Sequence, residues 1–162
     1  MKIGVIADTH IPERCSEIPA AVLKEFKKVD MIIHAGDLVD IIVLRKLQGF
    51  CPDVKAVCGN MDQEEAREEL PEKMVFDVSG FTIGLTHGYG SPDQLTKRLA
   101  EVFKKDKVDV IIFGHSHQPM NEKIGDILYF NPGSPTDTVF APYASYGIIE
   151  INCKIKARIV KF

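Results

Sequence analysis

The chain of 162 residues has no tryptophan and no long block of like charge. Its 20 Lys and Arg residues are mixed along the chain with 23 Asp and Glu residues, so the formal net charge is only −3. The dense positive patch with which proteins bind long nucleic acids is therefore missing, and we expect no such partner. At 45% hydrophobic and 27% charged residues, the composition is typical of one globular domain over residues 1–162.

Long hydrophobic runs and cysteine motifs are missing as well. The longest apolar run near the start, Ile3 to Ala7, is too short for a membrane span or the core of a signal peptide. The 4 cysteines show no C-x-x-C pair and no regular spacing, so we expect neither a disulfide framework nor a zinc knuckle. We therefore expect a cytoplasmic protein with no membrane partner.

The first 60 residues alternate between short apolar runs and segments in which apolar residues recur at helical spacing. Strands are expected at residues 2–7, 31–35 and 54–57, and helices at residues 17–29 and 40–47. This alternation predicts a parallel sheet covered by helices.

Later in the chain, strands neighbour strands. The turn signal Ser79-Gly80 separates two expected strands, and the C-terminal third shows strand patterns only. The expected strands are 73–78, 81–86, 108–113, 127–130, 146–151 and 154–160, with helices at 63–70 and 92–105. We therefore expect an α/β fold of two mixed sheets with helices packed outside them.

Five polar clusters follow the apolar runs, each at or just past an expected strand end. They are Asp8-Thr9-His10, Gly36-Asp37, Gly59-Asn60-Met61-Asp62, His87-Gly88 and Gly114-His115-Ser116-His117. In α/β folds, ligand sites form at the carboxyl ends of parallel strands. Four of the 5 histidines belong to these clusters, which makes this edge of the fold the candidate site.

The side chains of these clusters are suited to binding metal ions. Carboxylate, amide and imidazole donors without a thiolate favour Mn²⁺, Fe²⁺, Zn²⁺ or Ni²⁺. In an extended segment, residues two apart point the same way, so Asp8 with His10, and His115 with His117, are expected to present pairs of ligands. Seven donors exceed the needs of one transition metal and match two ions that share a carboxylate.

The order and spacing of these motifs resemble those of the calcineurin-like metallophosphoesterases. The matching motifs are D-x-H at Asp8, G-D at Gly36, G-N at Gly59, the isolated His87, and G-H-x-H at Gly114. The short chain and the stretch Asn131-Pro132-Gly133-Ser134 further resemble the small single-domain phosphodiesterases of bacteria and archaea. The resemblance implies a four-layer αββα sandwich, which agrees with the strands and helices expected above.

The resemblance also implies a binuclear metal centre with a bridging hydroxide as nucleophile. Carried over motif by motif, the first ion is held by Asp8, His10 and His117, the second by Asn60, His87 and His115, and both by Asp37. Mn²⁺ is the expected ion at both sites, with Ni²⁺, Fe²⁺ or Zn²⁺ as alternatives. Asp37, Asn60, Asp62 and His87 are the residues expected to take part in catalysis.

The sequence departs from the family at Met61. Many members carry G-N-H-[D/E], in which the His protonates the leaving oxygen, but Met61 cannot donate a proton. The loss of a general acid is worth on the order of 10²- to 10⁴-fold on poor leaving groups. The small phosphodiesterase branch also tends to lack this His. Asp62 is either a substitute acid, a residue that orients His10 or His87, or the N-cap of the following helix.

Several other polar residues have both a structural and a functional interpretation. His34 is expected in the core or behind a ligand, and Arg14 either binds a substrate phosphate or is a solvated surface residue. Asn131 either hydrogen-bonds a ligand residue or caps a turn. Tyr89, which follows His87, is a candidate to line the substrate pocket.

The function predicted from the sequence is a binuclear metal-dependent phosphodiesterase acting on small phosphodiesters. One alternative is a phosphomonoesterase of the same fold. Another is a non-catalytic interaction scaffold, because a retromer subunit shares this fold yet has lost part of the ligand set. A homo-oligomer is an open alternative to a monomer, built through the C-terminal strands or the apolar segment around Val139 and Phe140.

Overall fold

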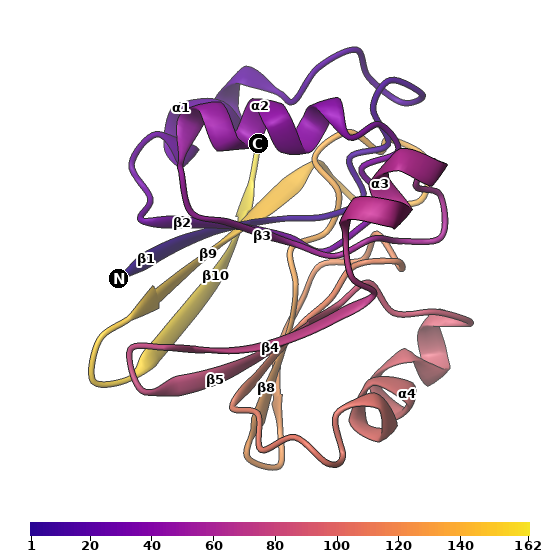
Figure 1. Cartoon of the computed structure of the whole chain (residues 1–162). Coiled ribbons are helices and arrows are strands. Elements are labelled where there is room, and N and C mark those ends of the chain that lie inside the picture. The colour runs from indigo at the N-terminus through magenta and orange to yellow at the C-terminus, as the bar shows by residue number, and fades with distance from the viewer.

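The computed structural model describes residues 1–162 and contains two five-stranded mixed sheets. The strand order is β10-β9-β1-β2-β3 in the first sheet and β4-β5-β6-β8-β7 in the second. Figure 1 shows the two sheets face to face, with α1 and α2 outside the first and α4 outside the second. The two-sheet α/β sandwich predicted from the sequence is therefore confirmed.

The first sheet is built from both ends of the chain. Its strands are β1 (Lys2–Ile6), β2 (Met31–His34), β3 (Val54–Ala56), β9 (Ser145–Ile151) and β10 (Ile155–Lys161). β1, β2 and β3 are parallel and are connected through α1 (Ala20–Phe26) and α2 (Ile42–Phe50). β9 runs antiparallel to β1 and pairs with β10 in the predicted C-terminal hairpin.

The second sheet is built from the middle of the chain. Its strands are β4 (Lys73–Val78), β5 (Phe81–Thr86), β6 (Val110–Ile112), β7 (Met120–Ile124) and β8 (Ile127–Asn131). β5, β6 and β8 are parallel, with antiparallel strands at both edges. The short helix α3 (Glu64–Glu69) precedes this sheet, and η1 (Pro92–Gln94) leads into α4 (Leu95–Val102). No helix is long and apolar enough to cross a membrane.

The sequence patterns missed one strand and misplaced several helix boundaries, among them both ends of α1 and of α2. β7 lies at a sheet edge and has mostly exposed residues, so it shows no alternation of apolar and polar side chains and forms through its backbone pairing with β8. α1 begins at Ala20 rather than Glu17, because Pro19 before it has an extended backbone. α4 ends at Val102 rather than Lys105.

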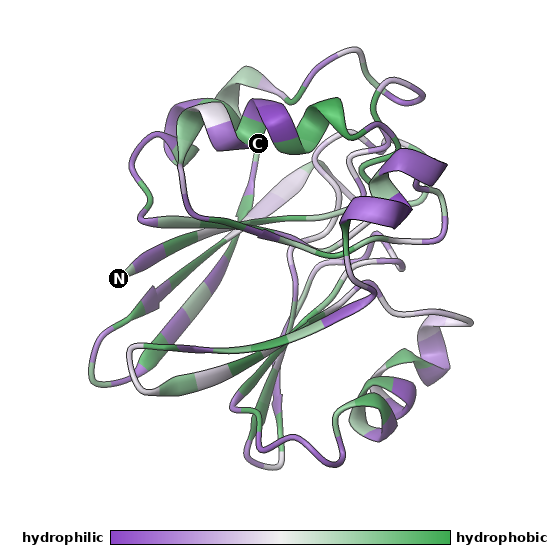
Figure 2. Ribbon diagram, in the orientation of Figure 1, coloured by the Kyte–Doolittle hydropathy of each residue, from purple (hydrophilic) through white to green (hydrophobic).

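Three apolar clusters fill the spaces between the four layers. The central cluster, which includes Ile3, Val5, Ile83 and Phe130, lies between the sheets, and the other two lie beneath α1 and α2 and beneath α4. Figure 2 shows hydrophobic colour running along the strands, whereas the outer helix α3 is almost wholly hydrophilic. Because both faces of the inner strands are buried, these strands read in the sequence as continuous apolar runs.

Close packing between α4 and the second sheet depends on a residue without a side chain. A β-carbon on Gly84 of β5 would lie 2.7 Å from the ring of Phe103, which follows α4. Phe103 is only 2% exposed, so its ring has no free space into which to move. The sheet therefore holds this ring by the close approach of its backbone.

We expect Gly84→Ala to lower the free energy of unfolding by about 1–3 kcal/mol, because the added methyl group overpacks the contact with Phe103. The matched control is Gly49→Ala in α2, where a β-carbon would meet nothing within 4 Å. The control should raise the free energy of unfolding by about 0.5–1 kcal/mol, since Ala favours helix over Gly. Chemical denaturation measures both, and a Gly84→Ala variant as stable as the wild type would contradict the described packing.

Candidate metal centre

The five polar clusters meet at one edge of the fold, just past the carboxyl ends of five strands. Asp8 and Asp37 follow β1 and β2 of the first sheet, and Asn60 follows β3. His87 follows β5 of the second sheet, and the G-H-x-H motif follows β6. The two sheets thus bring their strand ends together from segments that are more than 100 residues apart, as in the 107-residue separation between His10 and His117.

Five of the predicted metal ligands form a buried cluster. These residues are at most 8% exposed, and they are Asp8, His10, Asp37, His87 and His117. Two groups of three have ligand atoms that all lie within 4.8 Å of one another, one being Asp8, His10 and His117 and the other Asp8, Asp37 and His87. This clustering provides two adjacent positions at which a cation could bind.

The Asp37 carboxylate lies between histidines of the two predicted metal sites. Its Oδ2 atom is 3.5 Å from Nε2 of His10 and 3.2 Å from Nε2 of His87. Asp8 occupies a similar intermediate place, with Oδ1 3.4 Å from Nε2 of His117 and 3.9 Å from Nε2 of His87. Either carboxylate could thus contact two ions, and Asp37 is the one for which the family resemblance implies that role.

Asn60 and His115 lie together beside the buried cluster. Nδ1 of His115 is 3.1 Å from Oδ1 of Asn60, and Nε2 of His115 is 2.9 Å from the carbonyl oxygen of Gly90. The rings of His87 and His115 are nearby, with centroids 5.3 Å apart. His115 must therefore exchange one of its two present contacts to bind an ion.

The backbone at the ligands is not extended, which corrects one expectation from the sequence. Positive φ angles occur at Asp8 (54°), His10 (44°), Asp37 (56°), His115 (68°) and His117 (56°). The pairs two residues apart therefore do not converge by the alternation of an extended strand, and His115 and His117 contact different groups. Left-handed backbone costs on the order of 1 kcal/mol or more per residue, so the surrounding fold must hold these residues in place.

Two motif glycines are required by close approach of the ligand side chains. A β-carbon on Gly59 would overlap the Asp37 carboxylate, and one on Gly36 would lie 2.7 Å from Nδ1 of the His87 ring. Gly36 also has a φ of 89°, which favours glycine. In the G-D motif, Gly36 leaves room for the His87 ring beside Asp37, and in the G-N motif, Gly59 leaves room for the Asp37 carboxylate beside Asn60.

The charges of the buried cluster shift the pKa values of its members. Burial raises the pKa of Asp8 to about 6. Burial alone would lower the pKa of His87, but the carboxylates of Asp37 and Asp8 raise it to about 9. In turn, His87 holds the pKa of Asp37 below its usual value despite burial. Without a bound cation, the cluster therefore balances its negative charge by protonating His87.

The cluster contains unpartnered atoms that fit a divalent cation. Oδ2 of Asp8 is buried without a hydrogen-bond partner, and Nε2 of His87 lies 3.2 Å from Oδ2 of Asp37 without the geometry of a hydrogen bond. A buried polar atom left without a partner costs about 1–3 kcal/mol, and a cation between these atoms would remove that cost. Nδ1 of His87 donates to the carbonyl oxygen of Ala35 at 2.7 Å, which leaves Nε2 as the ring atom available to an ion.

Asp62 lies behind the cluster, and its geometry corrects part of the sequence interpretation. Both carboxylate oxygens accept backbone N–H groups, from Val39 at 2.6 Å and from Gly59 at 2.7 Å. Asp62 is not the N-cap of α3, because that position is Gln63. It also contacts neither His10 nor His87, so its contacts favour a role in holding the Asp37 and Asn60 loops together over proton transfer.

Asn131 caps its own turn and also bonds two neighbours of the predicted ligands, not the ligand residues themselves. Its Nδ2 atom donates to the carbonyl oxygen of Gly114 at 2.8 Å and to Oγ of Ser116 at 3.1 Å, both within the G-H-x-H motif. Its Oδ1 atom accepts the N–H of Gly133 at 2.9 Å within its own turn. Asn131 therefore links that turn to the loop that carries His115 and His117.

The sequence reasoning missed Asp137, which contacts a predicted ligand. Its Oδ2 atom lies 2.5 Å from Nδ1 of His117. Burial would raise the pKa of Asp137, but the N–H groups of Val139 and Phe140 and the hydrogen bond with His117 lower it to about 2. No pattern marks this residue in the sequence, since it stands in a stretch rich in Pro, Ser and Thr that reads as a loop.

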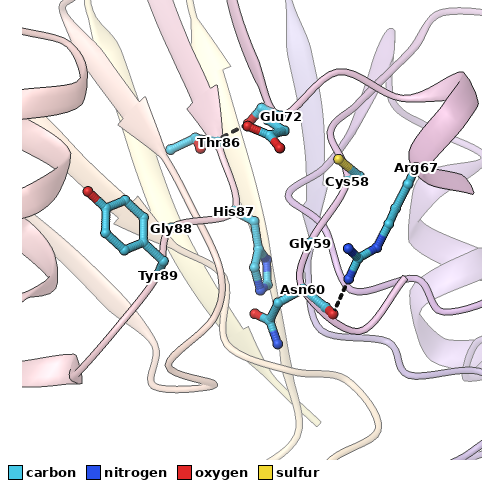
Figure 3. Close-up of a pocket in the computed structure, with 9 residues that line it drawn as sticks. All are labelled: Cys58, Gly59, Asn60, Arg67, Glu72, Thr86, His87, Gly88 and Tyr89. Carbon is cyan, nitrogen blue, oxygen red and sulfur yellow. Dashed lines mark hydrogen bonds between the residues drawn. The ribbon is translucent and has the colours of Figure 1, made fainter. Parts of the chain in front are cut away.

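Two cavities flank Asn60. The first, of about 350 Å³, opens onto the cluster and is lined by His10, Asp37 and His117, with Arg14, Met61 and Phe140 at its rim. The second, of about 380 Å³, lies on the side of Cys58 and Glu72 (Figure 3). There, Figure 3 shows Arg67 pointing toward the Asn60 carbonyl, to which it donates a hydrogen bond. Tyr89 lines this second cavity and not the first.

A sandwich of two mixed sheets with carboxylates, imidazoles and an amide gathered at its strand ends defines a metal-dependent phosphoesterase. Residues 1–154 match the calcineurin-like phosphoesterase superfamily domain, and the chain belongs to this family.

Its relatives include enzymes and a structure with a bound metal. A probable metallophosphoesterase of Methanothermobacter thermautotrophicus is 44% identical over 84% of this chain and 78% of that protein. A phosphodiesterase of Methanocaldococcus jannaschii is 28% identical over 82% of this chain and 83% of its own length. The crystal structure of Vps29 from Entamoeba histolytica complexed with zinc is 26% identical, with a TM-score of 0.78 over 99% of both chains.

His34 lies beneath the site and is fully buried. Its Nε2 atom is 3.1 Å from Oγ1 of Thr9, the residue between Asp8 and His10, and its Nδ1 atom has no partner. Burial lowers the pKa of His34 to about 3. The folded state keeps this ring neutral, whereas the unfolded chain protonates it below the unfolded pKa near 6.5. The free energy of unfolding therefore has its full value above pH 6.5 and decreases as the pH falls from 6.5 toward 3.

We expect the free energy of unfolding of the metal-free wild type to decrease below pH 6.5. The titration of His34 should contribute about 1.4 kcal/mol per pH unit to this decrease. A His34→Gln variant lacks this titration, so its stability should fall less steeply over the same range. Urea denaturation between pH 7.5 and 5 in the presence of a chelator measures both slopes. Equal slopes would contradict the buried neutral state of His34.

Proposed function

We propose that the chain is a binuclear metal-dependent phosphodiesterase that hydrolyses small phosphodiesters. The observation that carries this proposal is the Asp37 carboxylate, which lies between His10 and His87 at the base of an open cavity. A carboxylate shared between two sets of ligands is the arrangement that two-metal phosphoryl chemistry requires.

The donor set supports two adjacent ions. We assign Asp8, His10 and His117 to the first, Asn60, His87 and His115 to the second, and Asp37 to both. When bound there, divalent ions supply an activated water and positive charge for the phosphoryl oxygens. We expect Mn²⁺, with Ni²⁺, Fe²⁺ or Zn²⁺ as alternatives, because this mixture of oxygen and imidazole donors accepts each of them.

The chain's own residues orient the substrate at the cavity rim. Arg14 lines the cavity and carries a fixed positive charge near the place where a phosphodiester would lie. Its guanidinium carbon lies 5.5 Å from the centre of the Phe140 ring, which restricts the motion of the side chain. We therefore assign phosphate binding to Arg14, in preference to a role as a surface residue.

The rim position of Met61 favours substrates with good leaving groups. Its side chain is 48% exposed and lines the cavity where many relatives would place a histidine. Because a thioether cannot protonate a leaving oxygen, substrates with good leaving groups should react best. The similarity to the M. jannaschii phosphodiesterase favours diesters over monoesters, and the 350 Å³ cavity suits a small substrate.

A non-catalytic scaffold is the second candidate function. The likeness to Vps29 favours it, together with the exposed side chains of Val139 and Phe140, which are 69% and 60% exposed. The complete set of donors favours the enzyme. A cytoplasmic location and the oligomeric state remain predictions of the sequence alone.

The test of the proposed function strips the protein of metal and then restores Mn²⁺, Ni²⁺, Zn²⁺ or Mg²⁺. We expect Mn²⁺ to restore hydrolysis of bis(p-nitrophenyl) phosphate above that of p-nitrophenyl phosphate, in line with the similarity to the M. jannaschii phosphodiesterase. Absorbance at the nitrophenolate band measures both rates. A preference for the monoester would favour the phosphomonoesterase alternative.

The matched variant for this assay is Asp37→Asn, which removes the shared charge with little change in shape. We expect it to bind both ions more weakly and to lose nearly all of the restored activity. Calorimetric titration counts the bound ions. If the wild type binds no ion, the scaffold gains support over the enzyme, and full activity of Asp37→Asn with unchanged metal content would rule out the shared-ligand assignment.

Met61→His should restore a proton donor at the cavity rim. We expect it to accelerate hydrolysis of diesters with poor leaving groups by up to about 10²-fold and to change little for nitrophenyl esters. A series of aryl methyl phosphates of rising leaving-group pKa measures the slope of rate against leaving group for each protein. Parallel slopes would contradict the role assigned to this position.

A further inference from the structure

We propose that Asp137 is a positioning residue that fixes the ring of His117 with Nε2 toward the metal centre and, through the same carboxylate, holds the loop that carries Phe140. This inference rests on the proposed function only in that it takes His117 as a metal ligand. Asp137 stands 20 residues beyond His117, outside every motif of the family resemblance.

The contact with His117 determines which nitrogen carries the ring proton. Oδ2 of Asp137 lies 2.5 Å from Nδ1 of His117, and both residues are buried. A carboxylate can only accept a hydrogen bond, so Nδ1 is the donor and carries the proton. In the neutral ring, Nε2 then keeps its lone pair, and it faces the cluster, 3.4 Å from Oδ1 of Asp8 and 3.2 Å from Nε2 of His10.

Asp137 is itself held by the backbone around it. Its carboxylate accepts the N–H groups of Val139 at 2.8 Å, of Phe140 at 3.2 Å and of Ala141 at 3.2 Å. With these bonds and the bond from His117, the oxygens have fixed partners on two sides. The carboxylate therefore cannot rotate away from His117 without releasing the loop 139–141.

A second contact ties Asp137 to the other end of the site. Its backbone N–H donates to Oγ of Ser134 at 3.0 Å, and that hydroxyl donates to the carbonyl oxygen of Asp8 at 2.7 Å. Asp8 and His117, which we assign to the same ion, are thus both connected to one short segment. This segment sets the distance between the two ligands independently of any bound ion.

The loop held by Asp137 forms part of the cavity rim. The ring of Phe140 is edge-on to the ring of His117, with centroids 6.2 Å apart and an interplanar angle of 84°. The guanidinium carbon of Arg14, which we assign to phosphate binding, lies 5.5 Å from the centre of the same Phe140 ring. One buried carboxylate thus orders a metal ligand and the residues that would meet the substrate.

His87 is oriented by a different partner, and the difference predicts unequal metal sites. Nδ1 of His87 donates to the backbone carbonyl oxygen of Ala35, which is neutral. The charged partner of His117 makes its Nε2 a stronger donor to a cation. Removal of Asp137 should therefore lower the affinity for the ion held by Asp8, His10 and His117. The affinity for the other ion should stay nearly unchanged.

The experiment compares Asp137→Asn and Asp137→Ala with the control Asp126→Asn, which changes an exposed Asp in the turn between β7 and β8. We expect Mn²⁺ titration by calorimetry to show one of the two sites weakened by about 10- to 100-fold in Asp137→Ala, less in Asp137→Asn, and neither weakened in the control. Circular dichroism and thermal unfolding of each metal-free variant establish that it is folded.

A second measurement depends neither on hydrolysis nor on the folding of the Asp137 variants. Long-range ¹H–¹⁵N correlation spectra of the metal-free wild type report the tautomer of each histidine ring, and a spectrum of His117→Gln assigns the signals of His117. We expect His117 to carry its proton on Nδ1 in the wild type, and in Asp137→Ala to show a mixture of the two tautomers. A wild-type His117 protonated on Nε2 alone would overturn the inference even if every Asp137 variant failed to fold.

The outcomes separate this inference from the proposed function. Metal affinities and a His117 tautomer unchanged in both Asp137 variants would overturn the role of Asp137 while leaving the phosphodiesterase intact. Conversely, a wild type that binds two ions but hydrolyses no diester would count against the proposed function. In that case the weakened site in Asp137→Ala would still establish that Asp137 positions His117.

Discussion

The contact of the Asp37 carboxylate with His10 and His87 is the interaction on which the site depends. A buried carboxylate and two buried imidazole rings destabilise a fold unless the charge is balanced by an opposite charge and the polar atoms have hydrogen-bond partners. Here His87 takes up a proton, with its pKa raised to about 9, and Gly59 leaves the space that the carboxylate occupies. The site is thus built to bind positive charge, and the surrounding fold provides the rigidity that keeps it assembled.

That rigidity comes from the central apolar cluster between the two sheets. The strand ends leave this cluster and within a few residues adopt left-handed backbone, at Asp8, Asp37 and His115. Such conformations persist only where the neighbouring structure determines them strongly. Three side chains outside the ligand set make the ligand loops more rigid. Asn131 and Ser134 donate hydrogen bonds to backbone carbonyl oxygens of these loops, and Asp62 accepts one from a backbone N–H group.

Much of the fold could be predicted because buried strands leave a direct mark on the sequence. β1 and β2 lie inside the sandwich and read as continuous apolar runs, whereas the edge strand β7, with mostly exposed side chains, leaves no such mark and was missed. The five motifs were found because each pairs donors with a glycine or a strand end. The reason given for their convergence was wrong, because the ligand pairs are not in extended backbone.

The sequence by itself determined the inventory of donors, the family resemblance and the two-sheet architecture, because these follow from residue types and from periodicity along the chain. Only the tertiary structure decided which nitrogen of His87 and of His117 faces the cluster, that Asp62 holds two loops, and that Asp137 reaches His117. Hydrogen bonds such as that between Ser134 and the Asp8 carbonyl join residues 126 positions apart. Which distant residues become partners depends on how the two sheets pack. Local sequence periodicity indicates the face on which a residue lies but not its partner on another segment.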